Sequence, residues 1–298
     1  SVGVAYSPAA LLPFAFLLLG ISVGIPMSAV SLYVGRNIIE RRAAFLTLLN
    51  FTWSCGALIS PLLAGRILDH HSYRTVYLVI AASAFVSAIV CALALRDGHE
   101  LEADAQPQAV STVLRLILIF ALAAFLQVGI ENTSAAWLTT FAMRTSGSGM
   151  VVAAFSTSFY WAGFLVSRGA SSFLLLTANV DKVLRTAVGS ALCAAVLLVT
   201  VPDEWMRSFA MLLLGATLAP IYPLILDGFF ARARHSGDSR WILATAGFGG
   251  SVLPWIAGSL SSLTASLRLG MMVIPVALLL LAAELPAMRG RSQANLAR

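Results

Sequence analysis

The sequence predicts an all-α, polytopic membrane protein, and three observations carry that prediction. Of 298 residues, 59% are hydrophobic and only 11% are charged, and the mean hydropathy is +0.89. Soluble domains contain about 25% charged residues, so a chain this apolar could not cover the surface of a soluble fold. Long apolar runs recur along the chain, and short basic clusters separate them. This pattern is typical of helices that cross a bilayer in alternating directions.

Each expected element is an apolar run long enough to cross a membrane, since a hydrocarbon core of about 30 Å needs about 20 helical residues. Such runs lie at 9–34, 43–66, 75–95, 112–143, 149–176, 183–201, 206–230, 241–265 and 268–288. The first contains Pro26, the second Pro61, the seventh Pro220 and Pro223, and the eighth Pro254. Neighbouring helices can satisfy the backbone groups that these prolines free. We therefore expect nine transmembrane helices.

The distribution of Lys and Arg predicts the direction of the helices. Alternate connections, together with the C-terminal tail, hold fourteen of the 19 basic residues, and the other connections hold five. Because basic connections face the cytoplasm, we expect a multi-pass protein of the cell inner membrane with a cytoplasmic C-terminus and an external start. The net charge of +6 then reflects membrane topology, and we expect no nucleic-acid partner.

The sequence lacks the usual motifs for catalysis, metal binding and nucleotide binding. Cys55, Cys91 and Cys193 lie far apart in apolar runs and form neither a disulfide framework nor a zinc pattern. The Asp-His-His trio at 69–71 is an isolated loop sequence, and no GxxxxGK nucleotide loop occurs. We therefore expect no catalytic residues, no metal and no cofactor. An integral-membrane enzyme is the less favoured alternative from a different class.

Two stretches of the chain resemble each other. Residues 52–65, TWSCGALISPLLAG, share Thr, Gly, Pro, Ala and Gly at equivalent places with residues 245–258, TAGFGGSVLPWIAG. Parallel repeats of helix blocks are a transporter architecture. If helices one to three repeat as helices seven to nine, the partners of helices four to six are three further helices preceding Ser1. The predicted organisation is 1–96, the last three helices of an N-terminal half; 97–111, a polar cytoplasmic linker; and 112–298, a six-helix C-terminal half.

Five local patterns carry a family resemblance. They are Gln127-Val-Gly-Ile-Glu131 with Trp137, Phe159-Tyr-Trp-Ala-Gly163 with Ser167-Arg168, Ala219-Pro-Ile-Tyr-Pro223, Trp53-Ser-Cys-Gly-Ala with Pro61, and Ser72-Tyr-Arg74. Together they resemble the major facilitator superfamily, and within it the fucose-permease-like sugar:proton symporters. The resemblance extends from the family's fourth helix to its twelfth. It implies that family's fold, with a small solute, a proton, the bilayer and the missing N-terminal helices of the same chain as partners.

Glu131 is the ionisable residue placed deepest in an apolar run. Gln127 lies one helical turn earlier on the same face, and Asn132 is adjacent. Ionisable groups inside a membrane usually face a cavity or a partner. Glu131, Gln127 and Asn132 are therefore expected to bind a hydroxylated solute, to exchange a proton, or both. The alternative is a Glu hydrogen-bonded to a neighbouring helix for packing alone.

Further candidates for solute binding are amide and aromatic side chains. Asn50 and Trp53 lie three residues apart on one helical face, and an amide and an indole suit a sugar. The resemblance places both on the family's cavity-lining fifth helix. Trp161, with its neighbour Tyr160, and Tyr222 are weaker candidates. For all of these, packing or interfacial anchoring is the alternative.

Arg168 ends its run at the predicted cytoplasmic face, where the resemblance implies a gating residue and the alternative is a charge that snorkels to the headgroups. Asp227 is expected to pair near Arg232 at the same face. One departure from the family stands out. Fucose-type permeases carry a Glu on the fourth helix, and the stretch GISVGIPMS at 20–28 has no acid. The coupling acid is then Glu131, or it lies in the missing helices, or no proton is coupled.

These features predict a secondary active transporter of a sugar or other small polar solute, working by alternating access with a proton. An exporter of amphiphilic compounds from the same superfamily is the alternative, because aromatic and Met residues are abundant. The polar set on the predicted spans favours the first interpretation.

Overall fold

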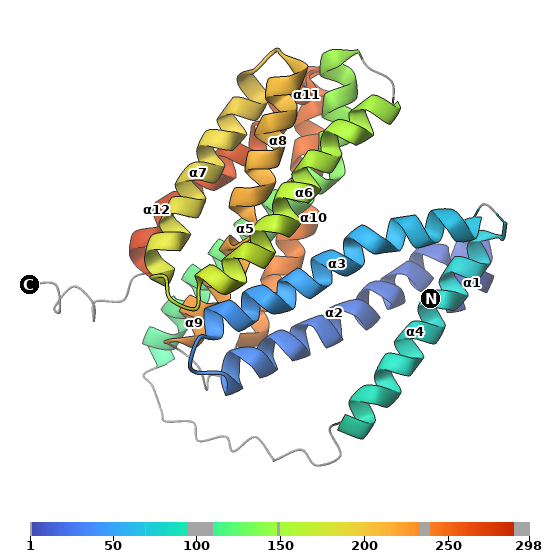
Figure 1. Cartoon of the computed structure of the whole chain (residues 1–298), viewed down its shortest axis with the longest axis horizontal. Coiled ribbons are helices and arrows are strands. Elements are labelled where there is room, and N and C mark those ends of the chain that lie inside the picture. The colour runs from blue at the N-terminus through green and yellow to red at the C-terminus, as the bar shows by residue number, and fades with distance from the viewer. Residues whose placement is uncertain (1, 69, 95–109, 148–149, 233–238, 289–298) are drawn as a thin grey trace, which may run out of the picture. The chain divides into compact units, whose positions relative to one another are not determined.

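The computed structural model describes residues 2–68, 70–94, 110–147, 150–232 and 239–288, and every regular element in these ranges is a helix (Figure 1). The chain begins with short α1 (Val2–Tyr6) and the 3₁₀ helix η1 (Ala9–Leu11). The long helices α2 (Leu12–Asn37), α3 (Arg42–Leu68) and α4 (Tyr73–Ala94) follow. The remaining helices are α5 (Val110–Ser146), α6 (Met150–Leu174), α7 (Val180–Thr200), α8 (Glu204–Leu218), α9 (Ile221–Phe230), α10 (Ser239–Thr264), α11 (Leu267–Met271) and α12 (Val273–Met288).

The helices coincide with the predicted apolar runs. Two runs are divided: 206–230 forms α8 and α9, and 268–288 forms α11 and α12. Among the described residues, seven stretches are long and apolar enough to cross a bilayer: Ala9–Asn37, Tyr73–Val90, Leu114–Ser146, Val180–Thr200, Glu204–Phe230, Arg240–Thr264 and Leu267–Met288. The prediction of an all-α, multi-pass chain is confirmed. The count of nine spans stays a prediction, because α3 and α6 are not among these seven.

The chain divides into two compact units. The first contains Ser1–Ser31 and Trp53–Ala105, and the second contains Leu32–Thr52 and Gln106–Arg298. In the first unit α1 packs against α4, and the Phe16 ring meets the Tyr77 ring edge-on with centroids 6.4 Å apart. Residues 97–109 of the predicted linker lie outside the described residues, so the division into two halves at 97–111 stays a prediction.

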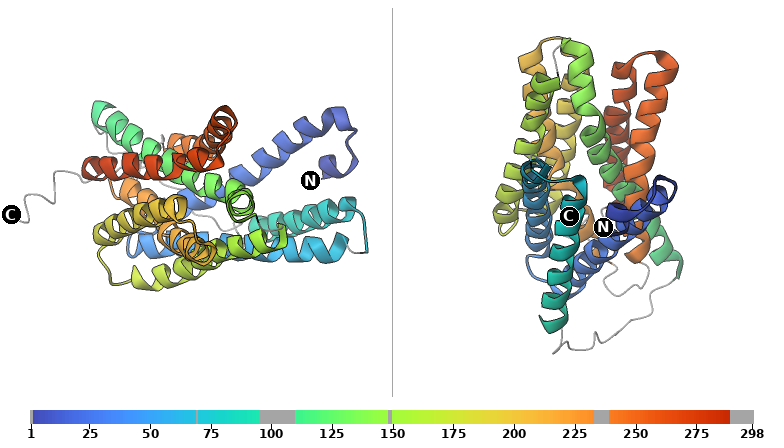
Figure 2. Two further views of the ribbon diagram at one scale, coloured as in Figure 1. Left: turned by 90° about the horizontal axis from the view of Figure 1, so that it is seen from above. Right: turned by 90° about the vertical axis from the view of Figure 1, so that its right-hand side faces the viewer.

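Close packing of helix backbones organises the second unit, whose helices α5 to α12 form a bundle (Figures 1 and 2). Helix α5 packs chiefly against α10, and α6 packs against α8. A Cβ atom added at Gly215 would overlap the carbonyl oxygen of Tyr160, and one added at Gly163 would overlap that of Leu212. Small residues at such contacts let helices approach closely, which provides packing energy where lipid removes the hydrophobic driving force.

The break between α8 and α9 follows from two prolines. Pro220 and Pro223 both lack a backbone N–H, so neither can continue a regular helical ladder. Position 223 would normally donate to the carbonyl of Ala219, four residues earlier. That carbonyl therefore becomes available to side chains of other helices. The carbonyls at this break accept hydrogen bonds from Arg168 and Gln127.

Candidate functional site

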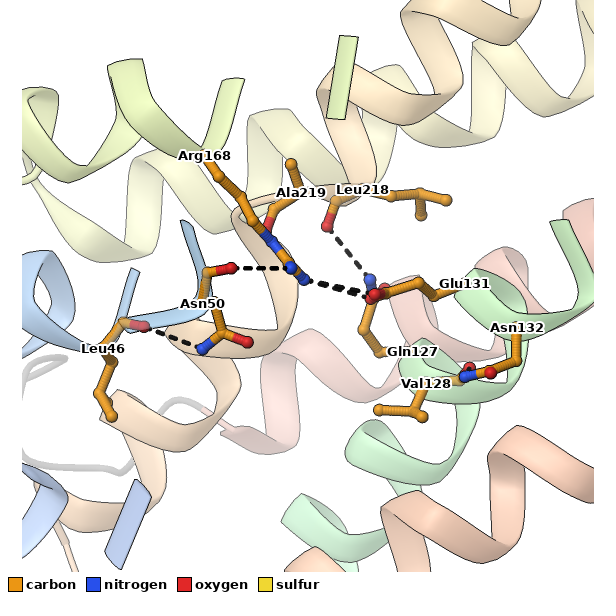
Figure 3. Close-up of polar contacts among 9 residues, drawn as sticks. All are labelled: Leu46, Asn50, Gln127, Val128, Glu131, Asn132, Arg168, Leu218 and Ala219. Atoms are coloured by element: carbon orange, nitrogen blue, oxygen red, sulfur yellow. Dashed lines mark hydrogen bonds and ion pairs between the residues drawn. The ribbon is translucent and has the colours of Figure 1, made fainter. Parts of the chain in front are cut away.

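An ion pair lies in the interior of the second unit. The Arg168 side chain on α6 places Nη2 3.4 Å from Oε1 and 3.5 Å from Oε2 of Glu131 on α5 (Figure 3). Arg168 is 1% exposed, and the Glu131 side chain is 14% exposed. Because removing two charges from water is costly, a buried pair needs further hydrogen bonds around it.

Main-chain carbonyls supply those additional bonds to Arg168. Its Nε donates to the carbonyl of Ala219 at 3.3 Å, and its Nη1 donates to the carbonyl of Asn50 at 3.2 Å. The guanidinium carbon also lies 4.1 Å from the centre of the Phe164 ring, a favourable position for a cation. The Ala219 carbonyl is available because Pro223 cannot donate to it. Arg168 therefore joins α5, α3 and the α8–α9 break.

Gln127 extends the polar cluster one turn along α5. Its Nε2 donates to the carbonyl of Leu218 at 3.1 Å, at the start of the same helix break. The side chain is fully buried, and its Oε1 has no hydrogen-bond partner among the described residues. An amide oxygen of this kind can accept a hydrogen bond from a hydroxyl group or from water.

Two tyrosines complete the surroundings of the ion pair. Tyr160 on α6 and Tyr222 on α9 both lie within electrostatic range of Glu131 and Arg168. Tyr160 is fully buried, and its hydroxyl has no hydrogen-bond partner among the described residues, while the nearby Ser134 donates to the carbonyl of Ile130. The phenols add a donor and an acceptor each to the cluster.

The structure brings together five of the predicted site residues: Gln127, Glu131, Asn50, Arg168 and Tyr222. The position of Arg168 does not fit the alternative interpretation, a charge that snorkels to the headgroups. Its side chain is buried and turned inward, because carbonyls from two other elements and Glu131 satisfy its donors. A snorkelling role is therefore excluded for this residue in the structure described.

The other three predicted residues have different surroundings. Asn132 lies beyond Glu131 from Arg168 in Figure 3, donates to the carbonyl of Val128 in its own helix at 2.9 Å and lies against α10. Trp161 packs edge-on against Tyr160 and Phe164, with ring centroids 5.1 and 5.9 Å apart, so it lies beside the aromatic rings of the cluster. Trp53 belongs to the first unit, where it is 43% exposed. The prediction that Asn50 and Trp53 form one binding face stays a prediction.

A second ion pair lies at Asp227, near the end of α9. Arg42, at the start of α3, donates from Nε to Asp227 Oδ1 at 2.8 Å and from Nη2 to the Asp227 carbonyl at 3.2 Å. The expected neighbour, Arg232, instead donates to the carbonyl of Gly228 at 2.7 Å. Asp227 therefore pairs with Arg42, which is distant along the chain and cannot be found from neighbouring residues in the sequence.

A carboxylate, a guanidinium, an amide and two phenols thus converge between apolar helices. Such a set can bind a hydroxylated solute and can exchange a proton at Glu131. Among the described residues, no group of His, Cys, Asp and Glu side chains is arranged to hold a metal ion. A polar interior in a bundle of membrane-crossing helices is the arrangement of a membrane transporter.

Comparison with known proteins identifies the family. The model of the Major Facilitator Superfamily matches residues 1–253, so the chain belongs to that superfamily. It is a superfamily of membrane transporters, and the predictions of family, fold class and non-enzymatic function are confirmed. No curated protein sequence matches the chain.

Two solved structures share the fold. One is the Major Facilitator Superfamily transporter FucP in its outward conformation, with a TM-score of 0.79 and 16% identity, over 97% of this chain and 78% of that one. The other is a variant of the E. coli fucose:proton symporter FucP, with a TM-score of 0.73 and 17% identity, over 89% and 73% of the two chains. At such identities the likeness concerns the fold alone.

Proposed function

We propose that the protein is a secondary active transporter that moves a sugar or another small polar solute by alternating access, coupled to a proton. The observation that carries this proposal is the buried pair of Glu131 and Arg168 inside the second unit. Ionisable groups at this depth are costly and usually serve transport or proton relay. The orientation deduced from the basic residues, with a cytoplasmic C-terminus in the cell inner membrane, belongs to the same proposal.

Glu131 is the residue that we assign to proton coupling. When a proton binds, the carboxylate becomes neutral and its attraction for the Arg168 guanidinium is lost. The two oxygens lie at 3.4 and 3.5 Å from Nη2, at the long end of the hydrogen-bond range, so the pair can be separated without breaking short bonds. The stretch at 20–28 contains no acid that could take this role.

Arg168 is the residue that we assign to gating. It contacts three elements, and two of its partners are the carbonyls of Asn50 and Ala219. Such neutral acceptors can be exchanged for a solute hydroxyl or for water at a modest free-energy difference. A change at Glu131 is therefore transmitted directly to the contacts between α3, α6 and the α8–α9 break.

A neutral, hydroxylated solute suits the remaining groups. Gln127 presents a buried amide oxygen that has no partner among the described side chains, and Tyr222 and Tyr160 present phenols that can donate or accept. Sugar hydroxyls both donate and accept, so they match this mixture. The fucose:proton symport named for a protein of the same fold agrees with this class of solute.

Uptake measurements test the proposal. Full-length protein in vesicles is given a panel of labelled sugars with and without an inward proton gradient. We expect one or more sugars to accumulate only with the gradient, and Glu131→Gln to abolish that dependence. Glu284→Gln on α12, which removes a carboxylate outside the cluster, should behave like the wild type. If no solute accumulates, or if Glu131→Gln responds to pH as the wild type does, the coupling role is wrong.

A further inference from the structure

Arg207 is a buried cation that the proposed transport site does not use. It lies in the first turn of α8 and is 2% exposed. Its Nη2 donates to the carbonyl of Pro202 at 2.7 Å. Its Nε and Nη1 are buried and have no hydrogen-bond partner among the described residues. One N–H on Nε and two on Nη1 are therefore left to bind an acceptor.

The surroundings of Arg207 are unlike those of Arg168. Its guanidinium carbon lies 5.9 Å from the centre of the Phe141 ring on α5. Arg268 on α11 is exposed and adds a second positive charge that repels the first. Two cations are thus held near one another at the end of the bundle where α5 ends, α8 begins and α11 lies. A bound anion would relieve that repulsion.

Two acids lie nearby, and neither forms a salt bridge with Arg207 within the described ranges. Asp203 caps α8, where its Oδ1 accepts the backbone N–H of Met206 at 2.8 Å. Glu204 is half-buried and attracts Arg207 only electrostatically. These carboxylates balance part of the charge, but they leave the three N–H donors of Arg207 unsatisfied.

The exposed face of the same helix indicates where a ligand would come from. Trp205 is 75% exposed and Phe209 is 52% exposed, and both flank Arg207 in sequence. Aromatic side chains of this kind gather at the level of the lipid headgroups. The basic-residue pattern places this end of the bundle outside the cytoplasm. We therefore expect Arg207 to lie near the level of the phospholipid phosphates.

We propose that Arg207 and Arg268 form a binding site for a phosphate group, carried by an anionic phospholipid headgroup or by free phosphate. Arg207 contributes the three unsatisfied N–H donors, and Arg268 contributes a second charge from the exposed side. A phosphate has several acceptor oxygens that can take these donors at once, and charged hydrogen bonds to guanidinium groups are among the strongest in proteins. The site is separate from the Glu131–Arg168 cluster and does not depend on its role.

Ligand binding to the purified full-length protein tests the site. Binding is measured by native mass spectrometry and by the shift in unfolding temperature in detergent. The three probes are phosphatidylglycerol, inorganic phosphate and, as a reference anion, chloride. We expect Arg207→Gln to weaken binding of the phosphate probe about tenfold or more, as for loss of a charged hydrogen bond. Arg185→Gln, which removes an exposed arginine near the start of α7 and away from the α7–α8 connection, should leave binding unchanged.

The outcomes distinguish the two sources of phosphate. Binding of phosphatidylglycerol alone assigns the site to a lipid, and binding of inorganic phosphate assigns it to a soluble ion. If Arg207→Gln does not fold, Arg268→Gln decides, because that side chain is exposed and its loss should still weaken binding severalfold. If phosphatidylglycerol and inorganic phosphate both bind these variants as tightly as the wild type, the proposal is wrong. Water alone then satisfies the Arg207 donors.

Discussion

Removing one charge of the Glu131–Arg168 pair should destabilise the protein more than removing both. Glu131→Gln keeps the shape of the side chain but leaves the buried guanidinium without its counter-charge. Breaking a buried pair from one side typically costs about 3–5 kcal/mol. Here Arg168 retains two carbonyls and the Phe164 ring, and the pair is long at 3.4 Å. We therefore expect the lower end of that range, about 3 kcal/mol.

The assay is a double-mutant cycle on unfolding temperature in detergent, with Glu131→Gln, Arg168→Met and the double variant. A loss of about 3 kcal/mol lowers the midpoint by about 5–10 °C for a chain of this size. The double variant should lose less stability than Glu131→Gln alone, because it leaves no unpaired charge. Coupling between neighbouring residues of this kind is about 0.5–3 kcal/mol. Strictly additive losses would refute the reasoning, since the two groups would then not act on each other.

Two other predictions concern packing and the second ion pair. Gly215→Ala should lower stability by about 1–3 kcal/mol, because the added Cβ overlaps the Tyr160 carbonyl. Gly189→Ala on α7 meets nothing within 4 Å and should be neutral or slightly stabilising in the same thermal assay, and equal effects would contradict the packing account. Asp227→Asn should cost about 1–3 kcal/mol, because Arg42 loses the charge of the partner oxygen at 2.8 Å. The charge-exchanged double variant, Arg42→Asp with Asp227→Arg, should regain part of the lost stability. If it is as unstable as Asp227→Asn, the ion pair does not stabilise the protein.

The sequence predicted the fold well because membrane helices are encoded locally. Length and apolarity suffice to place a span, and the helices observed coincide with the predicted runs. The break between α8 and α9 is harder to predict from the sequence, because prolines such as Pro220 and Pro223 are tolerated inside a continuous membrane helix. They end one helix and begin another because neither can donate to the helical ladder.

The site was predictable only along single helices. The sequence places Gln127 and Glu131 on one face of α5 because residues four apart on a helix share a face. Asn132 is adjacent to Glu131 in sequence, but successive residues on a helix are rotated by about 100°, which directs its side chain elsewhere. The partner of Glu131 could not be found in this way, because Arg168 lies on another helix. Pro223 is the clearest sequence signal for this contact. It has no backbone N–H, so the Ala219 carbonyl lacks its helical donor and can accept a hydrogen bond from another side chain.

Proton movement measured during solute entry tests the central claim most directly. Vesicles containing the full-length protein and a trapped pH indicator are given a transported solute without a preset gradient. Wild-type protein should move protons together with the solute. Glu131→Gln should still exchange labelled for unlabelled solute across the membrane, but without any proton movement. If Glu131→Gln carries protons with the solute as the wild type does, Glu131 is not the coupling residue and the account of the buried pair is wrong.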